Sequence, residues 1–185
     1  MTRVICAGHV NWDVTLHVDT LPGPDGEGVI GDQTQAAGGS AANTAAAPAG
    51  LDVETALLGS VGDDENGHLA RRELDAAGVD CQPVVEIEDG ATTVKYLVVD
   101  SDGQVMVLAN DGVNESYEAS DLGDGLLASA DHLHLTGQCP ETAGRLAGRA
   151  TEAGVTVSVD PGRRIDDRDY RDVVSAASYL FLNDR

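Results

Sequence analysis

The sequence has 185 residues, which is enough to bury the core of one ordinary domain. Its 32 acidic and 11 basic side chains give a formal net charge of −21, which argues strongly against binding to the phosphate backbone of a nucleic acid. No apolar run is long enough to span a bilayer and no secretory signal pattern is recognisable, so we expect a cytoplasmic protein with no membrane partner.

Two further features of the composition concern the solvent and the redox state. The surface is strongly acidic and Lys95 is the only lysine, which resembles proteins of salt-loving organisms, where concentrated salt screens the self-repulsion. Cys6, Cys81 and Cys139 are far apart and form no zinc-binding pattern, so we expect buried, reduced thiols.

The N-terminal segment predicts a buried strand over Arg3–Ala7, because its hydrophobicity is continuous. Asn11 and Asp13 follow, at the carboxyl end of that strand, where ligands collect in open α/β sheets. A carboxylate there can accept hydrogen bonds from two neighbouring hydroxyls of a polyol. The alternative is that these residues only form a turn.

The next segment predicts a hairpin that leads into a helix. Thr15–Asp19 and Glu27–Gln33 are expected to be its strands, outside the main sheet. Gly38 and Gly39 then precede a helix, so free N–H groups and the positive end of the helix dipole would face an oxygen-rich ligand, with Asn43 one turn further on. The alternative is an ordinary capped helix start.

The middle of the chain predicts a strand, a helix and a second hairpin. The strand covers Glu54–Ser60, and Pro48 should kink or end the helix before it near residues 47–50. Asp63 and Asp64 suggest a metal site, but acids at the start of the next helix are the favoured reading. A strand over Cys81–Ile87 comes next.

The second hairpin turns at an Asp-Gly pair, with strands over Thr93–Val99 and Gln104–Ala109. We expect the two hairpins to pair into a small sheet of their own. The rest of the chain alternates helices with strands, which predicts a parallel sheet with helices on both faces. The helices are Asp124–Ala130, Glu141–Ala153 and Tyr170–Ala177, and the strands are His132–Thr136, Val155–Val159 and Tyr179–Leu182.

Motifs of several other enzyme classes are missing from the sequence. No G-x-G-x-x-G follows the first strand, no glycine loop precedes Lys95 as a P-loop would require, and there is no G-x-S-x-G elbow of an acyl hydrolase. His132 and His134 lie two residues apart on one strand face, but no third ligand is recognisable, so a packed pair is favoured over a metal pair.

Taken together, the motifs resemble the N-terminal part of the PfkB, or ribokinase-like, family of carbohydrate and nucleoside kinases. The match extends along nearly the whole chain, and its order and spacing are those of the family. Its elements are Asn11-x-Asp13, Gly38-Gly39 with Asn43, Val61-Gly62-Asp63-Asp64 with Gly67, Gly78-Val79-Asp80, the Thr92 hairpin, Asp160-Pro161 and Asn183.

The resemblance implies a three-layer α/β/α fold with a parallel sheet and a small β-hairpin lid, the C-terminal part being missing. Residues 1–185 would then form one incomplete domain. Its core would cover about 1–13, 38–90 and 113–185, and its lid about 14–37 and 91–112.

The resemblance also implies roles for individual residues and an activity. The expected activity is ATP-dependent phosphorylation of a small sugar or nucleoside, with ATP and Mg²⁺ as cofactors and homodimerisation through the lid. The substrate would be held by Asn11, Asp13, Gly38, Gly39, Asn43 and Gln138; Thr93 and Lys95 would act from the lid; Asn183 would order magnesium and phosphates through water. No residue is expected to bind a metal directly.

Two departures from the family pattern stand out. Pro48 lies where the family continues a helix, and the chain ends at Arg185, before the G-A-G-D element that carries the catalytic aspartate. We therefore expect the substrate-binding and lid portion of a kinase, as a fragment or one piece of a split protein, without turnover of its own. A nucleoside kinase and a non-catalytic polyol- or nucleoside-binding module remain as alternatives.

Overall fold

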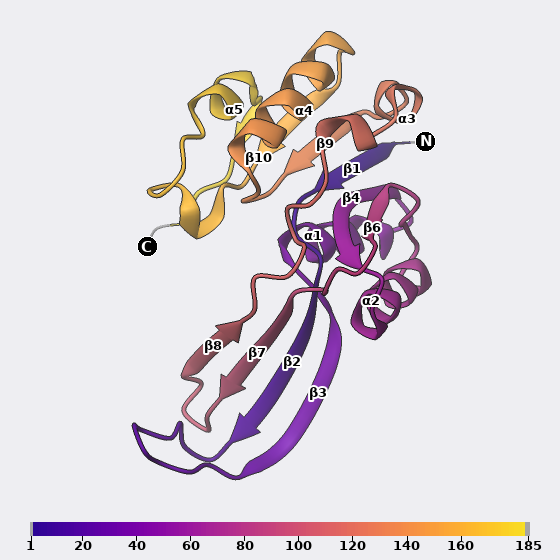
Figure 1. The fold of residues 1–185 in the computed structure, drawn as a ribbon. Helices are drawn as coiled ribbons and strands as arrows, with labels where there is room; N and C mark the ends of the chain where they lie inside the picture. Colours follow the sequence, from indigo (N-terminus) through magenta and orange to yellow (C-terminus); the bar gives the residue numbers. More distant parts are fainter. Residues whose placement is uncertain (1, 184–185) are drawn as a thin grey trace.

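The computed structural model describes residues 2–183, and within them seven strands form a sheet in which all pairs are parallel (Figure 1). The order is β11-β10-β9-β1-β4-β5, with β6 pairing further along β4. The strands are β1 (Arg3–Ala7), β4 (Glu54–Gly62), β5 (Val79–Asp80), β6 (Val84–Ile87), β9 (His132–Leu135), β10 (Thr156–Val159) and β11 (Tyr179–Leu180).

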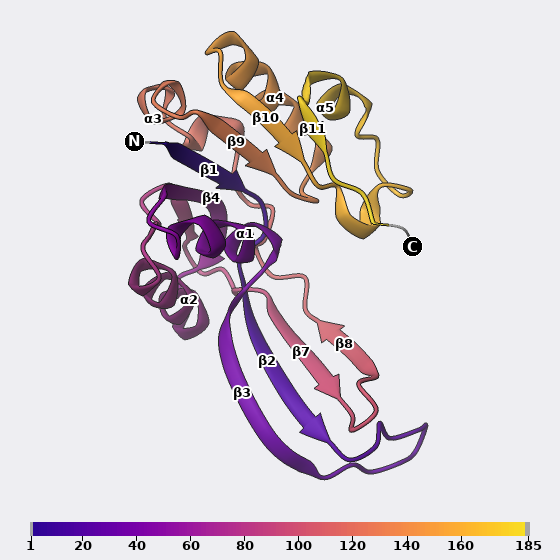
Figure 2. The same ribbon diagram turned by 180° about the vertical axis from the view of Figure 1, so that it is seen from behind.

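Helices cover both faces of this sheet (Figures 1 and 2). Successive side chains of β1 point to opposite faces of the sheet, so they pack against different helices. Ile5 and Ala7 pack with α3 (Asp124–Ala128), α4 (Pro140–Glu152) and α5 (Arg171–Ala176). Cys6 faces the other way, with α1 (Ser40–Ala49) and α2 (Glu65–Ala76). The predicted α/β class is confirmed, and α1 ends one residue after Pro48, within the predicted range.

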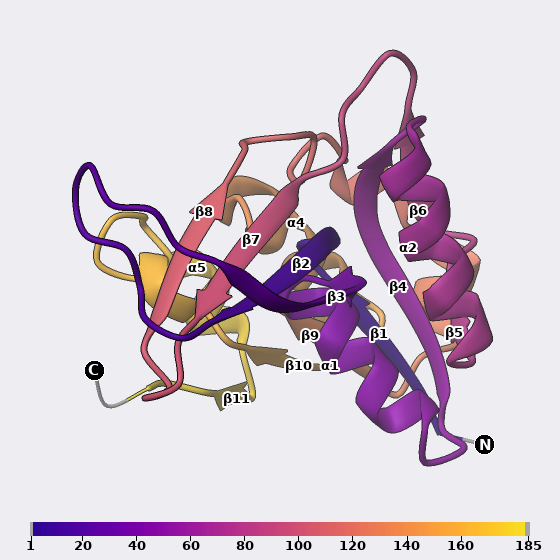
Figure 3. The same cartoon turned by 90° about the horizontal axis from the view of Figure 1, so that it is seen from below.

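A second sheet projects from one end of the first (Figures 1 and 3). Its order is β3-β2-β7-β8, with the central pair parallel and both outer pairs antiparallel. The strands are β2 (Asn11–Val18), β3 (Ile30–Gly38), β7 (Val94–Val99) and β8 (Val105–Ala109). The predicted pairing of the two hairpins into a sheet of their own is confirmed.

The first hairpin differs from its prediction at both strands. β2 begins at Asn11 rather than Thr15, and β3 runs over Ile30–Gly38 rather than Glu27–Gln33. Most of β3 is exposed and polar, so it has no hydrophobic alternation that could reveal its bounds. Its pairing with β2, from Asn11 opposite Gly38 onward, sets them instead. As a result Asn11 and Asp13 lie inside a strand and not in a turn.

The predicted strand over Cys81–Ile87 is wrong in its first half. A turn separates β5 from β6: the Gln82 N–H binds the Asp80 carboxylate at 2.9 Å, and the Val84 N–H binds the Cys81 carbonyl at 3.0 Å. Pro83 has no N–H to offer a neighbouring strand, so the ladder breaks there.

Asp64 caps the N-terminus of α2, as the favoured reading of the Asp63-Asp64 pair predicts. Its carboxylate accepts from the Gly67 N–H at 2.9 Å, from the Thr92 N–H at 2.9 Å and from the Thr92 hydroxyl at 2.6 Å. Burial opposes the charge, but these hydrogen bonds outweigh it and hold the pKa of Asp64 below its ordinary value. The cap therefore ties α2 to the chain just before β7.

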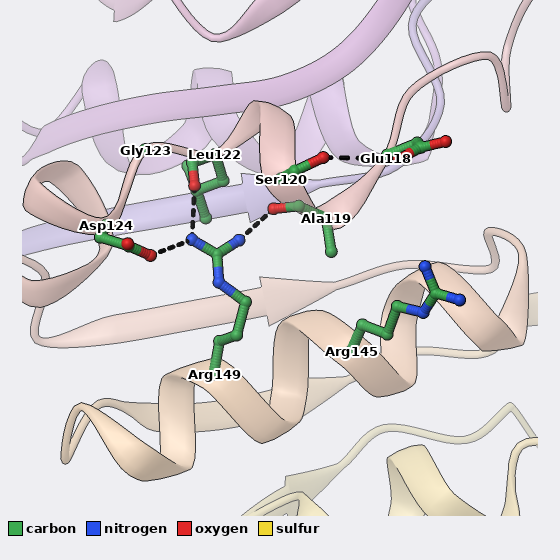
Figure 4. Close-up of a pocket in the computed structure, with 8 residues that line it drawn as sticks. All are labelled: Glu118, Ala119, Ser120, Leu122, Gly123, Asp124, Arg145 and Arg149. Atoms are coloured by element: carbon green, nitrogen blue, oxygen red, sulfur yellow. Dashed lines mark hydrogen bonds and ion pairs between the residues drawn. The ribbon is translucent and has the colours of Figure 1, made fainter.

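Arg149 fastens the segment before α3 to α4, beside a cavity of about 600 Å³ (Figure 4). The guanidinium donates to the carbonyls of Ala119 and Leu122 and to the Asp124 carboxylate, the last two at 2.6 Å. Arg145, on the same helix, pairs with Glu141 at 2.7 Å. The cavity therefore lies beside a structural contact of Arg149, and none of its lining residues is a predicted site residue.

Of the three cysteines, Cys6 and Cys81 are buried as predicted, whereas Cys139 is only half-buried. All three are free thiols, and burial raises the pKa of Cys6 to about 12. Among residues 2–183, no helix combines the length and the apolar character that a membrane crossing needs.

Candidate functional site

The candidate site lies where the two sheets meet, at the start of β2 and of α1. The chain leaves β1, passes Gly8 to Val10 and enters β2 at Asn11, beside the end of β3. Two glycines allow the chain segments at this junction to pack closely against each other. A Cβ on Gly38 would lie 2.0 Å from the Asp13 carboxylate, and one on Gly39, where φ is +102°, would lie 2.3 Å from the His9 carbonyl.

Asn11 and Asp13 point to the same face of the second sheet, because they are two residues apart on one strand. Asn11 is fully buried, and its Oδ1 accepts from the Asn114 amide at 2.6 Å. Its Nδ2 has no partner among the described residues, nor has the buried Oδ1 of Asp13. A buried donor and a buried acceptor are thus available to a ligand.

Lys95 lies next to Asp13 across the β2–β7 ladder. Burial raises the pKa of Asp13 above its ordinary value, and the positive charge of Lys95 only partly offsets this. Thr93, the residue before β7, binds the Trp12 N–H through its carbonyl at 2.9 Å and is buried. Both predicted lid residues therefore adjoin the predicted substrate residues.

A cavity of about 460 Å³ lies beside Lys95 and Thr93. On its far side are the segment after β8, with Asn114 and Glu115, and Arg168 from the segment before α5. Glu115 Oε1 accepts from Arg168 Nη1 at 2.7 Å and from His9 Nε2 at 2.9 Å. Burial disfavours the Glu115 charge, but these two donors outweigh it and lower the pKa of that carboxyl.

Gln138 follows β9 and is fully buried. Its Oε1 contacts the Tyr117 hydroxyl, and its carbonyl accepts from the Tyr170 hydroxyl at 2.6 Å. Its Nε2 has no partner among the described residues. The Ser40 hydroxyl donates to Thr136 at 2.9 Å, which fastens the start of α1 to the end of β9.

Two predicted site residues lie elsewhere. Asn43 is exposed on α1, and it lines a separate cavity of about 830 Å³ together with Asn183, which follows β11. The structure thus brings together Asn11, Asp13, Gly38 and Gly39 with Thr93 and Lys95, while Asn43 and Asn183 share another hollow. The expected catalytic aspartate, placed beyond Arg185, lies outside the described residues.

Sequence reasoning missed four residues of the site: His9, Asn114, Glu115 and Arg168. Three of them are in irregular segments far along the chain from Asn11, with no motif around them. His9 is the exception, since it stands two residues before Asn11. Its position just after the first strand could have marked it as a site residue, as it did Asn11 and Asp13.

His132 and His134 form the packed pair that the sequence favoured. A ring nitrogen of each histidine is hydrogen-bonded to the Ser158 hydroxyl, His132 Nε2 at 2.6 Å and His134 Nδ1 at 2.7 Å. Burial lowers the pKa of each imidazole. Within the part of the chain that the structure describes, no group of three His, Cys, Asp or Glu side chains is placed to hold a metal ion.

The chain is similar to a known family of kinases and to individual members of it. The pfkB family of carbohydrate kinases matches residues 1–185. Over 185 residues the chain is 60% identical to the ATP-dependent ribose-1-phosphate kinase of Halopiger xanaduensis, which covers all of this chain and 62% of that protein. It is also 27% identical to a nucleoside kinase of Methanothermobacter thermautotrophicus, over 86% of this chain and 52% of that one.

Solved structures show the same fold. The ribokinase of Arabidopsis thaliana, determined in complex with ribose and ATP, superposes with a TM-score of 0.84 at 24% identity over 97% of this chain and 59% of that one. The fold is therefore that of the ribokinases. The chain spans 52% to 62% of the length of these three relatives.

Proposed function

Because the chain belongs to the pfkB family of carbohydrate kinases, we propose that it supplies the sugar-binding part of an ATP-dependent kinase that phosphorylates a sugar hydroxyl. The observation that supports this role is the set of unpartnered buried atoms: Asn11 Nδ2 and Gln138 Nε2 as donors, and Asp13 Oδ1 as an acceptor. A sugar offers hydroxyls that both donate and accept, so it satisfies Asn11 Nδ2 and Asp13 Oδ1, which lie on one face of β2.

The substrate we propose is ribose 1-phosphate. The support is the 60% identity to a ribose-1-phosphate kinase, which is far above the identity to the ribokinase or to the nucleoside kinase. In this role the Asp13 carboxylate accepts hydrogen bonds from two ring hydroxyls, and Asn11 donates to a neighbouring oxygen. The free N–H groups at the start of α1, beside Gly38 and Gly39, face the same ligand.

The second sheet is proposed to act as the lid. Its face with Asp13 and Lys95 adjoins the site, whereas its opposite face carries Trp12 and packs toward α2. Covering the sugar would exclude water from the reacting hydroxyl and so suppress hydrolysis of the phosphoryl donor.

ATP would supply the phosphoryl group, and Asn183 is the residue assigned to its side of the site. Asn183 lines the cavity of about 830 Å³ with Asn43 and Thr44, whose polar groups are compatible with a nucleotide. Mg²⁺ in such sites is held largely by water and the phosphates of the nucleotide, so Asn183 would order it through water, and this role needs no cluster of acidic side chains among residues 2–183. The steps assigned to them are binding and orienting the sugar.

Homodimerisation through the lid is also proposed. β8 is the outer strand of the second sheet, and Val105, Met106, Val107 and Leu108 are 38–56% exposed on it. An unpaired strand with apolar side chains is suited to pairing with a second copy. Sedimentation velocity should then give the mass of a dimer, and a monomer at every concentration would contradict the proposal.

The proposal is tested by two measurements on the protein: calorimetric binding of ribose 1-phosphate, ribose, fructose and nucleosides, where we expect the sugars to bind, and phosphorylation of the same compounds with ATP, where we expect no turnover by residues 1–185 alone. Asp13→Ala should weaken sugar binding about 10- to 100-fold, because a charge-assisted hydrogen bond is worth about 1.5–3 kcal/mol. Asp32→Ala, an exposed site on β3, is the matched control and should bind as the wild type does. Unchanged binding by Asp13→Ala would refute the site.

A further inference from the structure

The cavity beside Lys95 gathers positive charge in a chain that has little of it. The sequence holds 11 basic against 32 acidic residues, yet its only lysine and Arg168, 73 positions apart, line the same cavity of about 460 Å³. The other arginines with ion pairs, among them Arg3 and Arg171, pair with carboxylates away from this cavity. Glu115 on the same wall pairs with Arg168, and Asp111 is exposed to solvent, so Lys95 is the cation left to attract an anionic ligand there.

Lys95 is the cation available to such a ligand. It makes no ion pair and no hydrogen bond within residues 2–183, and it is half-buried. Asp13 attracts it from the neighbouring strand but stands beyond ion-pair distance. All three N–H donors of the ammonium can therefore turn toward the cavity.

Arg168 is held in place chiefly by Glu115, and it also interacts with the Tyr170 side chain. Glu115 accepts from its Nη1 at 2.7 Å, and the same carboxylate oxygen accepts from His9 at 2.9 Å. A guanidinium has five N–H donors in a fixed plane, so the Glu115 contact orients Arg168 without using all of them. Asp111 is the other acid on the cavity wall, and it is exposed to solvent.

The cavity adjoins the place assigned to the sugar hydroxyls. Asn114, which lines it, donates to Asn11 Oδ1 at 2.6 Å, and Lys95 neighbours Asp13 in register. A ligand whose hydroxyls lie at Asn11 and Asp13 would therefore extend a substituent into the cavity.

We propose that this cavity binds the phosphate group of a phosphorylated sugar, with Lys95 as its principal counter-ion and Arg168, oriented by Glu115, as a second donor. This inference rests on the proposed function and assigns the residues that select a sugar phosphate over the free sugar. Lys95 is then a specificity-determining residue, distinct from the residues that read the hydroxyls.

The test is calorimetric binding of three probes to the protein: ribose 1-phosphate, ribose and inorganic phosphate. Lys95→Gln should weaken binding of ribose 1-phosphate about 10- to 100-fold, the range of a lost charge-assisted hydrogen bond, and leave ribose binding within about twofold. Lys95→Arg keeps the charge and should retain most of the preference. Arg72→Gln removes an exposed arginine on α2 and should change nothing.

The outcomes separate this inference from the proposed function. Equal loss of ribose and ribose 1-phosphate binding in Lys95→Gln, or loss of neither, would overturn the phosphate assignment while leaving the sugar site intact. Failure of the wild type to bind either sugar would overturn both. Circular dichroism on each variant identifies any that fails to fold. If Lys95→Gln fails to fold, the affinities of Lys95→Arg for ribose and for ribose 1-phosphate decide whether the charge at position 95 selects the phosphate.

Discussion

Gly38 leaves the space that the Asp13 carboxylate occupies. The two residues belong to neighbouring strands, and a methyl group at position 38 would stand 2.0 Å from Asp13 Oδ2. The glycine is therefore required by the side chain opposite it, and its own backbone needs no unusual φ. Gly39 differs, since its φ of +102° and the close His9 carbonyl both exclude a side chain.

Gly38→Ala should accordingly reduce sugar binding with little effect on folding. The added methyl displaces a flexible carboxylate, so Asp13 turns away from its ligand and affinity falls about 10- to 100-fold, as for loss of a charge-assisted hydrogen bond. Gly31→Ala on the same strand is the control, because its new Cβ would have only an ordinary contact of 3.7 Å. Calorimetry that shows equal affinity for both variants would contradict this explanation of Gly38.

The N-terminus of α2 joins one helix to the root of the second sheet. Asp64 caps the helix and at the same time binds both the N–H and the hydroxyl of Thr92, which is buried just before β7. Gly62 and Gly67 permit this close packing, because a Cβ on either would approach a backbone oxygen to 2.2 Å.

Asp64→Ala should lower the free energy of unfolding by about 2–4 kcal/mol, the sum of a lost N-cap and an unsatisfied buried group. Since the folded pKa of Asp64 lies below the ordinary 3.8, its contribution is complete at neutral pH and is lost as the pH falls below that value. Urea denaturation at pH 7 and near pH 3 measures both effects. Asp63→Ala, exposed next to it, should stay within about 0.5 kcal/mol of the wild type.

At the scale of elements, the sequence predicts what has strong periodicity or a clear stop signal. The buried strand β1, the helices around Leu74 and Leu146 and the Asp-Gly hairpin were all recognisable from local pattern. The bounds of β3 were not, because an exposed, polar edge strand carries no alternation. The turn at Pro83 was missed although proline offered a signal.

At the scale of the whole molecule, the site depends on distances along the chain that no local pattern encodes. Asn11 meets Asn114, and His9 meets Arg168 through Glu115, only because the segment after β8 returns to the junction of the two sheets. The motifs indicated Asn11 and Asp13 through their position after a strand. They could not indicate Glu115 or Arg168, which lie in irregular segments.

The net charge of −21 predicts a stability that depends on salt. At about 1 M salt the Debye length is near 3 Å, so the repulsion among surface carboxylates is screened in the compact state. The melting temperature should therefore rise as potassium chloride increases from about 0.1 M to about 2 M. A melting temperature that is highest at the lowest salt would show that repulsion does not limit this fold.

The position of Trp12 has one more consequence. It is the only tryptophan in the chain, it is 4% exposed, and it stands between Asn11 and Asp13 with its indole on the opposite face of the strand, where Nε1 donates to Gln35 at 3.0 Å. Sugars do not absorb light where indole does. We therefore expect the fluorescence of this one indole to report on the sheet junction without any label, and its emission to change when a sugar binds at Asn11 and Asp13.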